Sequence, residues 1–126
     1  GEARCICRDG FEGDLCGDQW TDKFLGEYSA TETCNNIGFS FNINALAGPE
    51  FKKFTLANFR NEATDSLTAK VVAEMVNPTV FNIPEQFMHF GAVTGFGSFS
   101  DGKINLTYEV INGKDTLLCT AELEPR

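Results

Sequence analysis

Residues 92–124, AVTGFGSFSDGKINLTYEVINGKDTLLCTAELE, carry the pattern that decides the fold. Apolar and polar side chains alternate along residues 104–110, as they do on a strand that buries only one face. Asp101-Gly102 and Asn112-Gly113 interrupt the pattern, and both dipeptides suit type I′ hairpin turns because their residues tolerate positive φ. The stretch therefore predicts an antiparallel meander of three strands, at residues 92–100, 103–111 and 116–124.

The same two-residue period is present earlier in the chain, most clearly in FSFNINA at residues 39–45. Residues 68–75 contain several good helix formers, but Val71-Val72 and the surrounding pattern favour a strand. The other predicted strands are residues 24–33, 37–45, 53–59, 66–76 and 80–83. Three prolines fall near the ends of these segments, as strand chemistry requires: Pro49, Pro78 and Pro84.

The chain has 126 residues, about the length of one domain, and a net charge of −8. An acidic chain without a basic cluster is repelled by nucleic acid and by anionic membrane surfaces, so neither is an expected partner. No apolar run reaches the roughly 20 residues of a transmembrane helix. Because the chain opens at Gly1 without Met, we expect any export signal or lipid anchor upstream of it.

The five cysteines indicate an extracytoplasmic protein: Cys5, Cys7, Cys16, Cys34 and Cys119. Disulfide bonds persist in oxidising compartments such as the periplasm or the cell surface. Zinc sites usually need paired cysteine knuckles or several histidines, whereas this chain has only His89. We therefore expect disulfides, with no metal and no cofactor.

The first three cysteines lie in CICRDGFEGDLC, residues 5–16. This segment resembles the last third of an EGF-like domain, whose ending runs C-x-C-x-x-G-[FY]-x-G-x-x-C. The resemblance implies that residues 1–16 are the C-terminal remnant of such a module, that Cys7 pairs with Cys16, and that Cys5 is left unpaired because its partner lies before Gly1. A fortuitous Cys- and Gly-rich loop is the alternative. Residues 17–22 are then a linker to a second domain, residues 23–126.

The two remaining cysteines, Cys34 and Cys119, are expected to form a disulfide with each other. Two free buried thiols are the alternative. Eight strands is the number at which an up-and-down sheet closes into a barrel with a filled or nearly filled interior. Cys34 ends the first predicted strand and Cys119 lies in the last, so they become neighbours when such a sheet closes. A β-sandwich is the alternative, but Trp20 lies outside the Cys-to-Cys span that encloses a Trp in immunoglobulin-type domains. We predict an all-β, antiparallel up-and-down barrel.

The segment Phe24-Leu25-Gly26-Glu27-Tyr28 resembles the G-x-W start of lipocalin-like (calycin) barrels, with Tyr in place of Trp. The order of parts is similar to a group of Bacteroidetes surface lipoproteins that join an EGF-like module to a small lipocalin-like β domain. This resemblance implies an anchored, outward-facing protein of the outer envelope of a Gram-negative bacterium.

No motif predicts catalysis. The stretch Gly95-Phe96-Gly97-Ser98 lacks the G-x-S-x-G of a nucleophile elbow, and it does not open a helix as a phosphate loop must. Its glycines are expected to let the strand bend or to leave room for facing rings. His89 is expected to pack beside aromatic residues or to lie exposed. The acidic residues near the N-terminus do not follow EF-hand spacing and are expected on a solvated surface: Asp9, Glu12, Asp14, Asp18 and Asp22.

Two functions follow from these features. The first is a non-catalytic cell-envelope protein that acts as a surface interaction or structural module and contacts a protein or glycan. The alternative is a small barrel that binds an apolar or amphipathic ligand. Filling of the barrel by inward-facing aromatic side chains argues against the alternative. The residues expected to fill it are Phe39, Phe41, Phe54, Phe96 and Tyr108.

Overall fold

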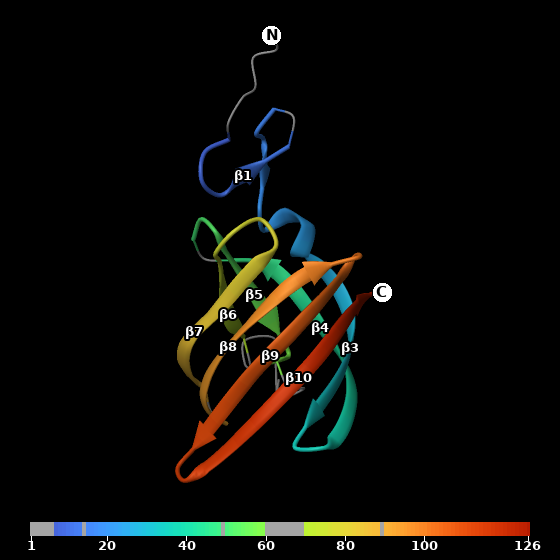
Figure 1. Cartoon of the computed structure of the whole chain (residues 1–126), viewed down its shortest axis with the longest axis vertical. Coiled ribbons are helices and arrows are strands. Elements are labelled where there is room, and N and C mark those ends of the chain that lie inside the picture. Colours follow the sequence, from blue (N-terminus) through green and yellow to red (C-terminus); the bar gives the residue numbers. More distant parts are fainter. Residues whose placement is uncertain (1–6, 14, 49, 60–69, 89) are drawn as a thin grey trace.

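The computed structural model describes residues 7–13, 15–48, 50–59, 70–88 and 90–126. Eight antiparallel strands form a closed up-and-down barrel in the order β10-β3-β4-β5-β6-β7-β8-β9 (Figure 1). Closure confirms the predicted fold class and excludes the sandwich. The strands are β3 Gly26–Cys34, β4 Ile37–Ala47, β5 Lys53–Ala57, β6 Val71–Met75, β7 Val80–Met88, β8 Gly91–Ser100, β9 Lys103–Asn112 and β10 Asp115–Pro125.

The barrel closes where its first strand meets its last. Strands β3 and β10 pair along seven positions, and at one end of this ladder Cys34 lies directly opposite Cys119. A disulfide joins these two buried residues, 85 positions apart in the sequence. The covalent bond therefore fastens the seam between the two strands that are most distant in the chain.

Of the two predicted hairpin turns, one is confirmed and one is displaced by a residue. Asp101 and Gly102 both have positive φ between β8 and β9, as a type I′ turn requires. The second turn is not Asn112-Gly113, because Asn112 is still in β9 and pairs with Asp115. Its central residues are Gly113 and Lys114, and of these only Gly113 has positive φ, which is the type II′ pattern.

The turn between β3 and β4 has the same type I′ conformation, but it was not predicted from the sequence. Cys34 pairs with Ile37, so the loop consists of Asn35 and Asn36 alone, and both have positive φ. Asparagine tolerates this conformation better than most residues other than glycine.

Strand β3 begins at Gly26 rather than at residue 24, because Phe24 ends a short 3₁₀ helix, η1 (Asp22–Phe24). Residues 71–75 form a strand and not the alternative helix, while the start of the predicted segment 66–76 lies outside the described residues. Strand β7 runs to Met88, five residues beyond its predicted end. Pro84 therefore lies inside a strand rather than near its end, at a register shift, where the missing N–H is tolerated.

A side chain replaces part of the backbone ladder between β6 and β7. These strands pair only at Glu74–Asn82 and Met75–Phe81. Beyond that point Gln86 bonds to the main chain of Val72: its Oε1 accepts from the Val72 N–H at 2.9 Å and its Nε2 donates to the Val72 carbonyl at 2.7 Å. The amide of Gln86 thus bridges the strands where their backbones separate.

We expect Gln86→Leu to lower the free energy of unfolding by about 1–3 kcal/mol, because it leaves both Val72 groups without their partner in a partly buried place. Urea denaturation measures the change. Asn82→Ala, at an exposed position of the same strand, is the control and should change stability by less than about 0.5 kcal/mol. Equal effects of the two substitutions would show that Gln86 does not hold this part of the wall.

The N-terminal segment forms a two-stranded ribbon at one end of the barrel, made of β1 (Phe11–Glu12) and β2 (Asp18–Gln19) (Figure 1). The disulfide Cys7–Cys16 closes it, and β2 occupies part of the segment expected to be a linker. The ribbon packs on the barrel, since the Phe11 and Phe51 rings lie 5.2 Å apart. The buried Trp20 also donates its indole N–H to the Phe11 carbonyl.

Candidate functional site

The barrel interior is the usual ligand site of such folds, and in the described residues it is occupied by the protein's own side chains. Phe24, fully buried at the ribbon end, lies 5.0 Å from the Phe54 ring, 5.6 Å from Phe81 and 5.3 Å from Phe99. Nearer the other end, the Phe59 ring lies 4.6 Å from Tyr108. These rings pack against aliphatic residues as one contiguous core.

The expected inward-facing aromatic residues are only partly correct. Phe54 and Tyr108 are buried, and Phe41 is half-buried against the core. Phe39 is an even number of positions from the buried Ile43, so both side chains lie on the inward face of β4. Phe39 is nevertheless 48% exposed, because it lies near the end of the barrel, beyond the core. It therefore contributes to a rim of the barrel and does not fill its centre.

Phe96 points outward and is 56% exposed, which makes its predicted inward orientation wrong. The inward positions of β8 include Val93 and Gly97, which are buried. Gly97 lies opposite Phe81, and a Cβ added to Gly97 would collide with the Phe81 ring. The expectation that a glycine here leaves room for a facing ring is thus confirmed, and that ring belongs to Phe81.

One buried carboxylate lies inside the barrel. Glu32 is 3% exposed, and its Oε1 accepts a hydrogen bond of 2.6 Å from the Tyr108 hydroxyl. It is the only carboxylate of the described residues that lies close to two cysteine sulfurs, those of Cys34 and Cys119. Because these sulfurs form a disulfide, the group offers one carboxylate and not a metal ligand set.

Tyr28 stands where the lipocalin-like pattern has Trp. Its ring is buried in the barrel and its hydroxyl donates to the Phe24 carbonyl at 2.7 Å. Burial raises the pKa of the Tyr28 hydroxyl above its usual value. The contact ties β3 to the η1 helix, so this position has a structural role.

The N-terminal acidic residues were expected on a solvated surface, and in the described part of the chain Asp9, Asp18 and Asp22 are exposed while Glu12 is half-buried. Asp9 pairs with Lys52 and Glu12 with Lys23. Lys23 also donates to two carbonyl oxygens, those of Trp20 and Pro78, so it joins the ribbon to the β6–β7 loop. Asp14, Cys5 and His89 lie outside the described residues.

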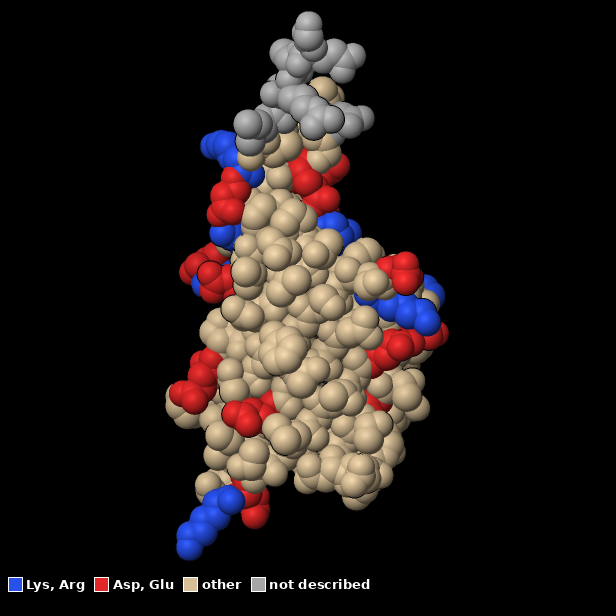
Figure 2. Space-filling view, viewed as in Figure 1, with Lys and Arg blue, Asp and Glu red and all other residues tan. Residues whose placement is uncertain are grey.

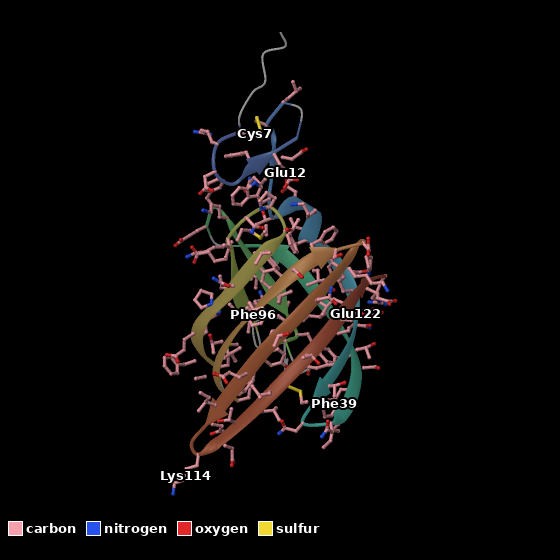
Figure 3. The ribbon with its side chains drawn as sticks, viewed as in Figure 1. Cys7, Glu12, Phe39, Phe96, Lys114 and Glu122 are labelled. Atoms are coloured by element: carbon pink, nitrogen blue, oxygen red, sulfur yellow. A yellow bond between two sulfur atoms is a disulfide. The ribbon has the colours of Figure 1, made fainter. Side chains whose placement is uncertain are left out.

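The outer surface of β7–β10 carries exposed apolar side chains that form what we call the outer apolar face: Phe87, Phe96, Ile111 and Leu118. Phe87 is 82% exposed and Leu118 60%. Ala92 pairs with both Phe87 and Ile111, which places the latter two in one row across the sheet. Figure 2 shows a broad uncharged surface with charged side chains mostly around it, and Figure 3 places Phe96 in its middle.

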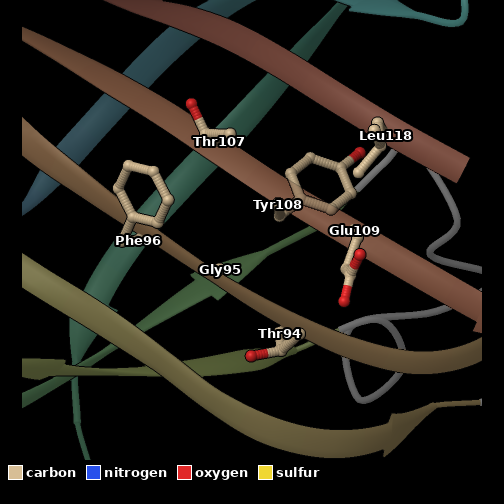
Figure 4. Close-up of a pocket in the computed structure, with 7 residues that line it drawn as sticks. All are labelled: Thr94, Gly95, Phe96, Thr107, Tyr108, Glu109 and Leu118. Atoms are coloured by element: carbon tan, nitrogen blue, oxygen red, sulfur yellow. The ribbon is translucent and has the colours of Figure 1, made fainter.

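A depression of about 250 Å³ lies within the outer apolar face (Figure 4). Phe96 borders it on one side and Glu109 and Leu118 on the other, while the backbone of Gly95 lies between them. Glu109 lies directly opposite Leu118 in the β9–β10 ladder. It is the only charged residue that lines the depression among the described residues.

No protein-family model matches the chain, and no curated protein matches its sequence. In the described part of the chain, no helix has the length and apolar character needed to cross a membrane.

Proposed function

We propose that this protein is a non-catalytic interaction module of the cell envelope that contacts its partner through the outer apolar face. The observation that carries the proposal is the division of the aromatic residues between two environments. Phe24, Phe54 and Phe81 fill the interior, whereas Phe87 and Phe96 face solvent. Exposed aromatic side chains grouped on one face are typical of protein interaction sites.

An extracytoplasmic location is supported by both disulfides, because such bonds persist in oxidising compartments. The similarity of residues 5–16 to an EGF-like ending, followed by a lipocalin-like barrel, supports placement among the Bacteroidetes surface lipoproteins described above. In this proposal a lipid anchor upstream of Gly1 holds the protein at the outer membrane, and the barrel faces a protein or glycan.

The absence of catalysis is part of the proposal. In the described residues four cysteines are consumed by disulfides and Glu32 is occupied by Tyr108. Lys23 and Lys52 form ion pairs with the ribbon. These contacts support structural roles for these particular described residues.

The alternative function, binding of an apolar ligand in the barrel, is favoured by one observation. Ile37 and Phe39 are exposed at inward-phase positions of β4, at the end opposite the ribbon (Figure 1). An apolar rim of this kind is compatible with a barrel mouth. A ligand that entered from there would have to displace packed rings such as Phe59 and Tyr108.

Site-specific photo-crosslinking on cells of the natural host tests the interaction function. p-Benzoylphenylalanine replaces Phe96 in one variant and Ser40, an exposed outward residue of β4, in the control. We expect an adduct of defined mass from position 96 and none from position 40. Adducts from both positions, or from neither, would contradict a partner bound at the outer apolar face.

A further inference from the structure

We infer that the depression between Phe96 and Glu109 receives a basic side chain, arginine or lysine, of a partner protein. The inference rests on the proposed function and specifies the chemistry of the contact. It follows from the combination of a carboxylate, an exposed aromatic ring and an aliphatic side chain around one small depression.

The geometry matches the three parts of a basic side chain. Phe96 pairs with Thr107, two residues before Glu109 on the same face of β9, so the ring and the carboxylate border the depression from different sides (Figure 4). Phe96 and Glu109 are diagonal neighbours on adjacent strands, and such positions are about 7–8 Å apart. A cation placed between them can therefore approach both the aromatic ring and the carboxylate. Leu118 offers an apolar surface to the methylene stem that carries the cation.

Charge complementarity selects a cation over other groups. Among the described residues no lysine or arginine forms an ion pair with Glu109. Lys103, on the same strand, is bound instead to Glu124 and Glu122, whose hydrogen bonds raise its pKa. The whole chain carries a net charge of −8, which further favours a basic partner.

The same carboxylate disfavours other occupants. A purely apolar partner surface would cover Glu109 without compensating its charge, which is costly. A second copy of this chain would bring two such carboxylates toward each other if it used the same face. A glycan is disfavoured because it binds through hydrogen bonds to polar groups, and one such group at the depression is already engaged. The Thr94 hydroxyl donates to the Ile83 carbonyl at 3.3 Å.

An NMR titration of the whole chain with a defined probe tests the inference. The probe is the peptide acetyl-Leu-Arg-Leu-amide, and its control contains citrulline, which has nearly the same shape without the charge. We expect the arginine peptide to shift the backbone amides of Gly95 and Thr107 saturably and the citrulline peptide to bind about fivefold more weakly. Equal affinities for the two peptides, or no saturable shift, would overturn the inference.

Variants identify the groups responsible. Glu109→Gln is expected to weaken binding of the arginine peptide about fivefold and Phe96→Leu about threefold. Glu85→Gln, at an exposed carboxylate of β7, is the matched control and should bind like the parent chain. An unchanged affinity in Glu109→Gln would contradict a carboxylate–cation contact.

The outcomes separate this inference from the proposed function. If position 96 crosslinks a partner on cells and Glu109→Gln leaves the arginine-peptide affinity unchanged, the interaction face stands and the basic side chain is wrong. If methyl β-glucoside shifts the Gly95 and Thr107 amides and the arginine peptide does not, the partner is a glycan. Absence of crosslinks from position 96 overturns the proposed function itself.

Discussion

Replacing both Cys34 and Cys119 by alanine is expected to lower the free energy of unfolding by about 4–5 kcal/mol, the largest effect of any change considered. The disulfide closes a loop of 85 positions, and in the chain-entropy model its removal frees the unfolded chain accordingly. Both cysteines are buried directly opposite each other in the β3–β10 seam, so their loss also weakens packing where the barrel closes. Guanidinium denaturation of the two proteins measures the difference.

The ribbon disulfide provides the control for this prediction. Cys7 and Cys16 are separated by only 9 positions, so their replacement by alanine should cost less, about 2–3 kcal/mol in the same model. The double variant at Cys34 and Cys119 is also expected to exchange the β3 and β10 amide hydrogens faster than those of β8 and β9. A loss below about 1 kcal/mol would mean that the ladder alone secures the seam.

Phe24→Ala is expected to lower the free energy of unfolding by about 3–5 kcal/mol. The Phe24 ring is fully buried and contacts three other rings, those of Phe54, Phe81 and Phe99. Its removal leaves a cavity that these neighbours, fixed on β5, β7 and β8, fill only in part. Thermal and urea denaturation report the loss.

Phe87→Ala is the matched control, because it deletes the same ring from a side chain that is mostly exposed. We expect this change to alter stability by less than about 0.5 kcal/mol. Comparable losses in the two variants would contradict the division between interior and outer phenylalanines. The contrast therefore tests the observation on which the proposed function depends.

The C-terminal meander was predictable from the sequence because two-residue turns link β8 to β9 and β9 to β10. Strong alternation along β9 fixes which of its side chains face inward. The second turn was misplaced because Asn-Gly and Gly-Lys both provide a glycine at a position of positive φ. The course of β7 was not predictable, because the strand continues past Pro84 through a register shift in its pairing with β8. On its other side, a side-chain amide, that of Gln86, bonds to the main chain of Val72 in β6.

The inward or outward direction of the phenylalanines was harder to predict. In β8 the large residues Phe96 and Phe99 are three positions apart, so they cannot share a face, and the glycines between Val93 and Phe99 weaken the alternation. Val93 and Phe99 are separated by an even number of positions, and this phase indicates that Phe96 faces outward. The pair Leu117-Leu118 carries a similar signal, because one of two adjacent leucines must leave the core.

The depression itself could not be predicted from sequence. Phe96, Glu109 and Leu118 come from three strands, and only the register of β8, β9 and β10 brings them around one point. No sequence motif connects these three positions. The site also depends on the outward direction of Phe96 in β8, a strand whose glycines weaken the alternation.

The central claim is that the barrel interior is occupied by the protein's own side chains and that contact with a partner takes place outside it. Native mass spectrometry of the protein purified from its natural host tests this most directly, by comparison with the mass under denaturing conditions. We predict the same mass in both states, that of the covalent chain with its disulfides. A small apolar molecule present in the native state and released on denaturation would contradict the claim and establish the barrel as a carrier.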